Sequence, residues 1–84
     1  MYAKLKSPIF IDSVVFEFAE RPNQPIKAVL KDEEGSVRGR LHTMVPTGAK
    51  SYVWDGLNDL PYGIYTLEYS EGVEEHRQRL VKRI

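Results

Sequence analysis

Few side chains in this 84-residue chain are of the types that perform catalysis or hold metal ions. There is no cysteine, and the only two histidines, His42 and His76, lie far apart without a second ligand at metal-binding spacing. Because zinc sites gather several Cys and His ligands, we expect both histidines to be solvent-facing strand residues. Neither a Gly-x-Ser-x-Gly nucleophile motif nor a glycine-rich phosphate loop occurs. We therefore expect no catalytic residue, no metal, no other cofactor and no enzymatic activity.

Oxygen ligands are more concentrated, since Asp55, Asn58 and Asp59 fall within one short loop. Carboxylate and amide oxygens are the ligands that Ca²⁺ takes, but the EF-hand pattern fails at Leu57, where its third position requires Asp or Asn. Asx side chains in turns usually bond to their own backbone. A turn is therefore the preferred interpretation of this loop, and a calcium site is the alternative.

Large aromatic residues gather in the same part of the chain, with the only Trp at position 54 and two Tyr at positions 65 and 69. Aromatic and β-branched residues favour a half-buried pleated surface. We expect Trp54, Tyr65 and Tyr69 to contribute to the core of a β-structure, with Trp54 as a core or rim anchor. A sugar- or peptide-binding face formed by the same rings is the alternative.

The end of the chain, from His76 onward, is locally basic and contains four Lys or Arg without an acid. The first interpretation is the solvated face of an edge strand, on which charge opposes aggregation. The second is a recognition tail for a protein partner. Nucleic acid ranks last, because neither a second basic patch nor stacking aromatics accompany the tail.

Composition excludes several broad classes of partner. The twelve basic and twelve acidic residues cancel, which predicts no general attraction to nucleic acid or to an anionic membrane. No apolar run reaches the roughly 20 residues needed to span a bilayer. The first residues contain no apolar signal-peptide core, so an export signal would have to lie on a longer precursor. The absence of cysteine fits a reducing compartment without establishing one.

Turn signals recur every 8–12 residues or so between short alternating runs, which is typical of an all-β sandwich. We expect one domain over residues 1–84, with a core from about residue 7 to 84. A glycine within a strand, Gly39, indicates a bulge or a close approach of another group. The final segment is expected as a strand rather than a helix. The predicted strands cover residues 4–10 (an edge strand or tether), 13–19, 26–32, 36–45, 51–54, 63–69 and 74–84.

Several short motifs follow one another in an order that resembles a known family. The opening box is Ser7-Pro8-Ile9-Phe10, followed by an alternating strand. Later come Trp54-Asp55-Gly56, then Gly63-Ile64-Tyr65, and a closing segment from Gln78 to Arg83. Taken together they resemble the C-terminal sorting domain of proteins exported by the type IX secretion system of Bacteroidetes. They are also similar to the immunoglobulin-like domain of the flagellar hook-capping protein.

This resemblance implies an immunoglobulin-like antiparallel β-sandwich of about seven short strands. It also implies a non-enzymatic address that directs an upstream cargo through the periplasm to the outer membrane or cell surface. The last strand would be recognised by the secretion machinery through its free backbone groups, with the Gly-x-Tyr turn holding it in place. The implied recognition residues are Gly63, Tyr65, Leu80, Val81, Lys82 and Arg83.

The alternative function is a structural or adhesive immunoglobulin-like module that binds a scaffold protein in a larger assembly. A free-standing chain of that kind would be cytoplasmic. In either case we expect a protein partner, no nucleic acid and no insertion into a membrane, and a homodimer formed through edge strands is left open.

Overall fold

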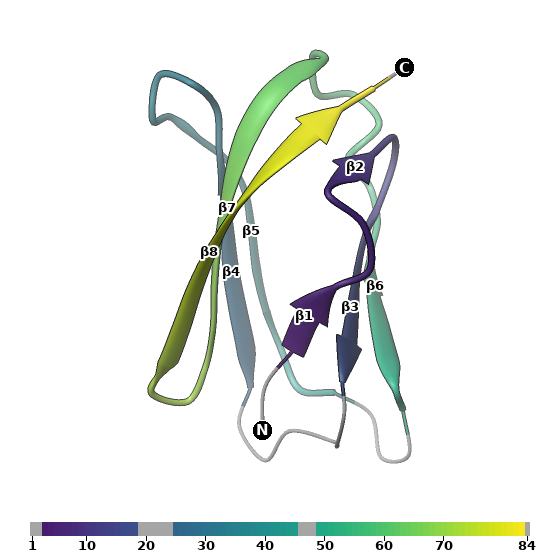
Figure 1. Cartoon of the computed structure of the whole chain (residues 1–84), viewed down its shortest axis with the longest axis vertical. Coiled ribbons are helices and arrows are strands. Elements are labelled where there is room, and N and C mark those ends of the chain that lie inside the picture. The colour runs from purple at the N-terminus through teal and green to yellow at the C-terminus, as the bar shows by residue number, and fades with distance from the viewer. Residues whose placement is uncertain (1–2, 19–24, 46–48, 84) are drawn as a thin grey trace.

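The computed structural model describes residues 3–18, 25–45 and 49–83, which form eight strands (Figure 1). None of these residues belongs to a helix long and apolar enough to cross a membrane. The connections between predicted strands at residues 20–25 and 46–49, which we expect to be turns, lie largely outside the described residues. The strands are β1 (Ala3–Leu5), β2 (Ile9–Phe10), β3 (Val14–Phe18), β4 (Ile26–Lys31), β5 (Val37–Thr43), β6 (Ser51–Trp54), β7 (Gly63–Glu71) and β8 (Glu74–Lys82).

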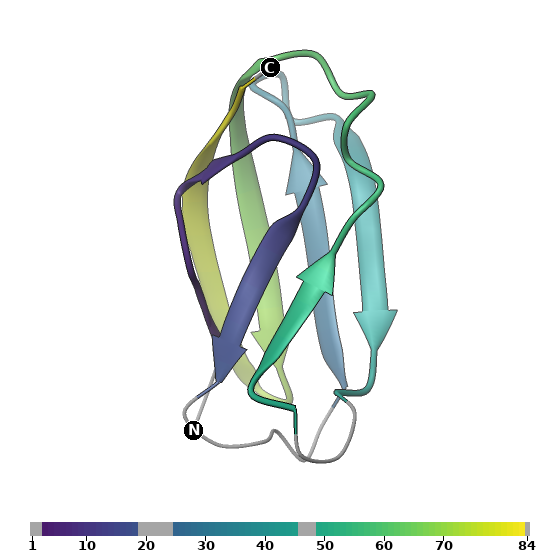
Figure 2. The ribbon, with the colours of Figure 1, turned by 90° about the vertical axis from the view of Figure 1, so that its right-hand side faces the viewer.

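The strands form two sheets that pack face to face. One has the order β1-β3-β6 and the other β2-β8-β7-β4-β5, and Figure 2 shows the smaller sheet in front of the larger one. This is the strand arrangement of an immunoglobulin-like sandwich, so the expected fold class is confirmed. There are eight strands because the predicted segment 4–10 divides into β1 and β2, one in each sheet. All pairs are antiparallel except β2 with β8.

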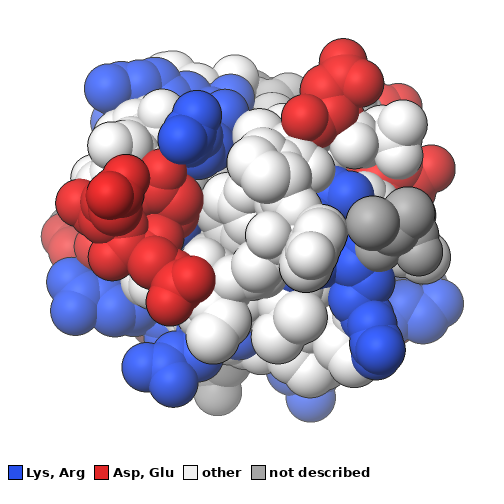
Figure 3. All heavy atoms as spheres, turned by 90° about the horizontal axis from the view of Figure 1, so that it is seen from above, with Lys and Arg blue, Asp and Glu red and all other residues white. Residues whose placement is uncertain are grey.

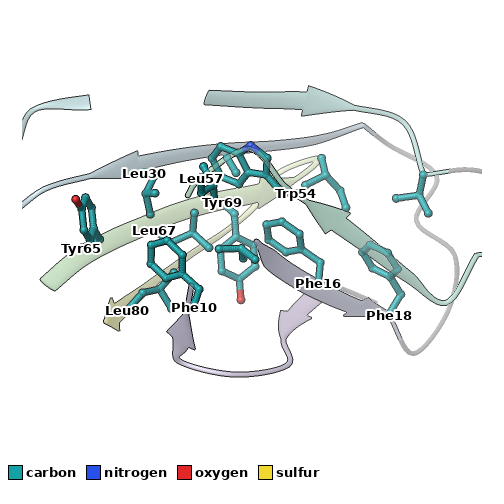
Figure 4. Packing of buried hydrophobic residues seen from close by; sticks show 14 residues of the cluster. Phe10, Phe16, Phe18, Leu30, Trp54, Leu57, Tyr65, Leu67, Tyr69 and Leu80 are labelled. Carbon is teal, nitrogen blue, oxygen red and sulfur yellow. The ribbon is translucent and has the colours of Figure 1, made fainter. Parts of the chain in front are cut away.

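The core lies between the sheets and follows the alternation of the sequence. In β3, Val14, Phe16 and Phe18 are buried, whereas Glu17 between them is exposed. The β4 side chains alternate in the same way, as expected for a strand with one face toward the core. The Phe16 ring meets the Tyr69 ring of the opposite sheet edge-on, with centroids 5.5 Å apart (Figure 4). Such contacts join the two sheets through their aromatic side chains.

Trp54 and Gly39 meet in this core, a contact that neither prediction named. The Trp54 side chain is buried, with 8% of its surface exposed. A Cβ added at Gly39 would lie 3.1 Å from Trp54 Cζ2, which is closer than ordinary packing allows. The β4–β5 register also shifts between Leu30 and Lys31, beside Gly39. The predicted bulge and the predicted close approach are therefore both confirmed at this glycine.

The final segment is a strand, as expected, because it forms a hairpin with β7. The two strands pair along their whole length, from Gly63 opposite Lys82 to Glu71 opposite Glu74. Two residues remain for the turn, and the first, Gly72, has a φ of +61°. A glycine with positive φ at this place is typical of two-residue hairpin turns. The β7–β8 hairpin therefore carries the end of the chain back to the end of the sandwich where β7 begins (Figure 1).

Candidate functional site

Tyr65 fixes the start of β7 at the end of the sandwich where the described chain finishes. Its hydroxyl donates a 2.6 Å hydrogen bond to the Pro61 carbonyl oxygen. Its ring packs edge-on against Phe10 of β2, with centroids 5.9 Å apart. A tyrosine that bonds back to the preceding backbone in this way is the tyrosine corner of immunoglobulin-like sandwiches. Burial raises the pKa of the Tyr65 hydroxyl, so this group remains a hydrogen-bond donor at neutral pH.

The last residues of β8 alternate between the two faces of the larger sheet. Leu80 and Lys82 point inward, with 1% and 3% of their surfaces exposed. The Lys82 Nζ donates a 2.9 Å hydrogen bond to the carbonyl oxygen of Arg83. Val81 and Arg83 are exposed. Of these predicted recognition residues, only Val81 and Arg83 can therefore present their side chains to a partner.

The backbone of this segment is paired on both sides. Its Val81 N–H donates to the Pro8 carbonyl oxygen and its Arg83 N–H to that of Phe10, each over 2.9 Å. Strand β7 pairs with the opposite side. The expectation of free backbone groups at the end of the last strand is thus wrong, because the short parallel strand β2 covers them. The side of β8 that no described strand covers is the earlier part, residues 74–79.

Exposed apolar side chains lie next to one another on the outward face of this segment. Val81 lies between Ile9 of β2 and Ile64 of β7 in the strand register. All three are substantially exposed, and Tyr62, just before β7, is 71% exposed. A shallow hollow between them is lined by Tyr62, Gly63, Ile64, Val81, Lys82 and Arg83. We call the exposed set the C-terminal platform, and it consists of Ile9, Tyr62, Ile64, Val81 and Arg83.

Gly63 lies at the edge of the C-terminal platform and has a φ of +149°. An added Cβ would meet no heavy atom within 4 Å, so the need for glycine comes from the backbone conformation alone. Gly63 is paired with Lys82 across the β7–β8 hairpin. The backbone conformation of Gly63 therefore determines how its two neighbours, Tyr62 and Ile64, are placed.

Charge differs between the two sides of Tyr62. On one side the hollow contains Arg83. On the other a second hollow is lined by Asp32, which is paired with Arg38, and by Glu33 and Glu34. Seen from above, the middle of this end of the molecule is uncharged, with a group of acidic side chains at the left (Figure 3). Exposed apolar surface bordered by polar groups is typical of protein–protein contact sites. The arrangement can hold an apolar side chain of a partner between flanking charges.

The acidic turn beside the C-terminal platform is ordered by Asp32. Its Oδ1 accepts hydrogen bonds from the backbone N–H groups of Glu34 and Ser36, both over 2.9 Å. Its Oδ2 accepts a 2.9 Å bond from Arg38 Nε. The hydrogen bond from Arg38 is the main reason that the pKa of Asp32 is lowered. Asp32 is therefore ionised at neutral pH and holds the β4–β5 turn in one conformation.

The two histidines have different environments. His42 is exposed on β5, as expected. His76 points to the inner side of β8, where its ring lies 5.2 Å from the Tyr69 ring, so the expectation that it faces solvent is wrong. The cause is the hairpin register, which places His76 opposite the buried Tyr69. Across the ranges that the structure describes, no three His, Asp or Glu side chains are gathered to hold a metal ion.

The Asp55–Asp59 loop is anchored by an apolar side chain. Leu57 is buried, and its N–H donates a 3.1 Å hydrogen bond to the Asp12 carbonyl oxygen. Asp55, Asn58 and Asp59 are exposed around it. The loop thus folds around Leu57, the residue that interrupts the calcium-binding pattern.

The aromatic residues at positions 54, 65 and 69 belong to the core. Trp54, Tyr65 and Tyr69 are each less than 9% exposed and lie in one buried cluster (Figure 4). They do not line a surface, so the preferred interpretation from the sequence holds. Tyr62, by contrast, is exposed.

Three members of the C-terminal platform were missed from the sequence: Ile9, Tyr62 and Ile64. Ile64 carried a signal, since it alternates with the core residues Tyr65 and Leu67 but is itself apolar. The place of Ile9 depends on the parallel pairing of β2 with β8, which joins segments at opposite ends of the chain. A scan of protein-family models found no match to this chain, and a search of curated proteins found none.

Proposed function

We propose that this domain is a non-enzymatic recognition module, a sorting domain of the type IX secretion kind that is read at its C-terminal platform. The observation that carries the proposal is the meeting of three motifs of the resemblance. The opening box containing Ile9, the Gly63-x-Tyr65 motif and the closing segment around Val81 lie on β2, β7 and β8, which are neighbours in one sheet. Segments more than fifty residues apart thus form one surface.

Each of these three strands has a buried residue next to an outward-pointing residue, and this difference supports the proposal. Phe10, Tyr65 and Leu80 are buried and fix the three strands against one another. Their neighbours Ile9, Ile64 and Val81 point outward. Side chains of the second group would contact a protein of the secretion machinery or of a scaffold, with the apolar contacts supplying most of the affinity.

The positions of β1 and of the C-terminal platform also suit an address that is read while a cargo is attached. Strand β1 begins at the end of the sandwich opposite the C-terminal platform (Figure 1). The longest dimension of the domain is 33 Å. A cargo joined before β1 would therefore leave the C-terminal platform uncovered. In this proposal the domain passes through the periplasm as part of a longer precursor and reaches the cell surface.

Export of a fused cargo tests the proposal. Deletion from Leu80 onward is unsuitable, because it removes a buried core residue and the strand that pairs with β2. The better variant is Val81→Asp, which changes an outward side chain. The matched control is Val73→Asp, because Val73 lies in the β7–β8 turn, away from the C-terminal platform, and is 98% exposed.

In a bacterium with type IX secretion, we expect Val81→Asp to reduce export of the fusion about tenfold or more, the loss typical of a substituted interface centre. Val73→Asp should be exported like the parent. Circular dichroism of the purified domains checks that both variants are folded. Export of folded Val81→Asp at the parent level would reject the sorting function and favour the structural or adhesive module.

A further inference from the structure

Strand β5 leaves one side of the larger sheet open. It is the terminal strand in the order β2-β8-β7-β4-β5 and pairs only with β4 among the described strands. Figure 2 shows it at the right-hand margin of the sandwich, with no strand beyond it. The irregularity at Lys31 confines the regular pairing to the stretch from Gly39 to Thr43. An edge of this kind offers backbone N–H and C=O groups that another strand can pair with.

The outward side chains beside this edge are cationic or neutral. On β5 they are Arg40 and His42, both exposed. On β4 the side chains in the same rows are Val29 and Lys27. Neither Arg40 nor Lys27 forms an ion pair with any residue that the structure describes. Lys27 and Arg40 therefore place positive charge, unpaired within the described ranges, at this corner of the sheet, although the whole chain is neutral.

The inward side of the same edge is apolar and incompletely covered. Leu41 of β5 and Tyr52 of β6 are partly buried and packed against the core. The Trp54 ring beneath Gly39 is buried, so the partly covered apolar surface on this side is that of Leu41 and Tyr52. A further strand paired with β5 would place its inward side chains against this part of the core. Apolar residues at alternate positions suit that surface.

We propose that β5 binds an extended acidic segment of a partner protein as an added strand. The segment alternates Asp or Glu with apolar residues. Its acidic side chains lie opposite Arg40 and His42 on the outward face, and its apolar side chains lie opposite Leu41 on the inward face. Main-chain hydrogen bonds supply affinity, and the alternating charge selects the partner. This site is separate from the C-terminal platform and does not rest on the proposed sorting function.

The same charges disfavour a second copy of this chain as the occupant. Two β5 edges paired about a two-fold axis through residue 40 or residue 39 would set Arg40 opposite Arg40 or opposite Arg38. Like charges that lie directly opposite across two strands are destabilising, whereas opposite charges stabilise the pair. The open edge of β8 provides a contrast, because it mixes Glu75 with Arg77 and Arg79 and so selects for neither sign.

A synthetic peptide tests the proposal directly. The probe is a capped nine-residue peptide in which Glu alternates with Val, titrated into the isotopically labelled domain and followed by amide NMR. We expect the largest shifts at the β5 amides of Val37–Thr43. Three control peptides separate the contributions of charge and of main-chain hydrogen bonds. One has Lys in place of every Glu. The other two are N-methylated at alternate amides, one at the odd-numbered amides and one at the even-numbered amides. The Lys peptide should not bind, and at least one N-methylated peptide should lose binding.

Two variants then distinguish strand addition from attraction to a basic face. Arg40→Glu should weaken binding of the Glu peptide about tenfold, because a favourable cross-strand pair becomes a repulsive one. Arg79→Glu makes the same change in charge on the same outward face, but on β8, with β7 and β4 between it and β5. It should leave the affinity nearly unchanged. Val81→Asp, which tests the sorting function, should also leave peptide binding intact.

Three results would overturn the proposal. The first is the absence of shifts at β5 when the Glu peptide is added. The second is equal weakening by Arg40→Glu and Arg79→Glu, which would mean that the whole face attracts anions without pairing. The third is undiminished binding of both N-methylated peptides, since an added strand requires its amide hydrogens.

Discussion

The two halves of strand β8 differ in what lies beside them. Residues 74–79 pair with β7 on one side, and no described strand covers the other side, where charged side chains are frequent. From Leu80 onward, β2 covers the second side and apolar side chains appear on the outward face. In the first half, the second side of β8 has no described strand beside it and the side chains are mostly charged. In the second half, the exposed side chains are apolar and the backbone groups are hydrogen-bonded to β2. A partner of the C-terminal platform must therefore contact the side chains of the platform. It cannot add a strand there, because β2 already pairs with that side of β8.

The largest effect that tests this contrast is expected at Leu80. Leu80→Ala should lower the free energy of unfolding by about 2–5 kcal/mol, because it opens a cavity in the core. Val81→Ala, at the next residue but facing outward, should cost about 1 kcal/mol or less. Urea denaturation followed by Trp54 fluorescence measures both. Equal losses at the two positions would contradict the assignment of one residue to the core and the other to the C-terminal platform.

A smaller effect on stability is expected in the first half of β8, residues 74–79, where ion pairs contribute to the contact between strands. Glu68 of β7 accepts 3.1 Å contacts from Lys31 of β4 and Arg77 of β8. The hydrogen bond from Lys31 is the main reason that the pKa of Glu68 lies below its usual value of 4.5, and Arg77 adds to it. Because the folded-state pKa is lowered, the stabilisation is present above pH 4.5 and is lost as the pH falls through the lowered value.

Carboxyl NMR titration of the folded domain measures this shift. The pKa of Glu68 should rise in Lys31→Gln and, to a smaller extent, in Arg77→Gln. The C-terminal half of β8 does not contact Glu68, so the Val81 amide signal should have the same position in Lys31→Gln and Arg77→Gln as in the parent domain. A Glu68 pKa that is unchanged in both variants would show that these ion pairs are not formed in solution.

The local features of this fold follow from the sequence because their causes are local. Alternation over Val14–Phe18 and Ile26–Lys31 predicted which side chains enter the core, since successive side chains of a strand face opposite ways. The glycine at position 39 predicted a close contact before its partner was known, and the partner is Trp54. The strand character of residues 74–82, also expected from the sequence, has a local cause in the Gly72 turn, which commits the end of the chain to a hairpin.

What could not be predicted depends on pairing between distant segments. The backbone of Val81 is paired on its second side by β2, which lies about seventy residues earlier in the chain. No local pattern states that Ile9 and Val81 are neighbours, so the segment was expected to be an open edge. The inward position of His76 likewise depends on the β7–β8 register, because a shift of one residue would turn it outward.

The central claim, that a partner reads the outward side chains of the C-terminal platform, is tested most directly by site-specific photocrosslinking in living cells. A photoreactive amino acid replaces Val81 in a fused cargo and, in a second strain, replaces Val73. We predict a crosslinked product between the Val81 position and a protein of the export machinery, and none from the Val73 position. Efficient export of both fusions with no product at Val81, or with the same product from both positions, would contradict the claim.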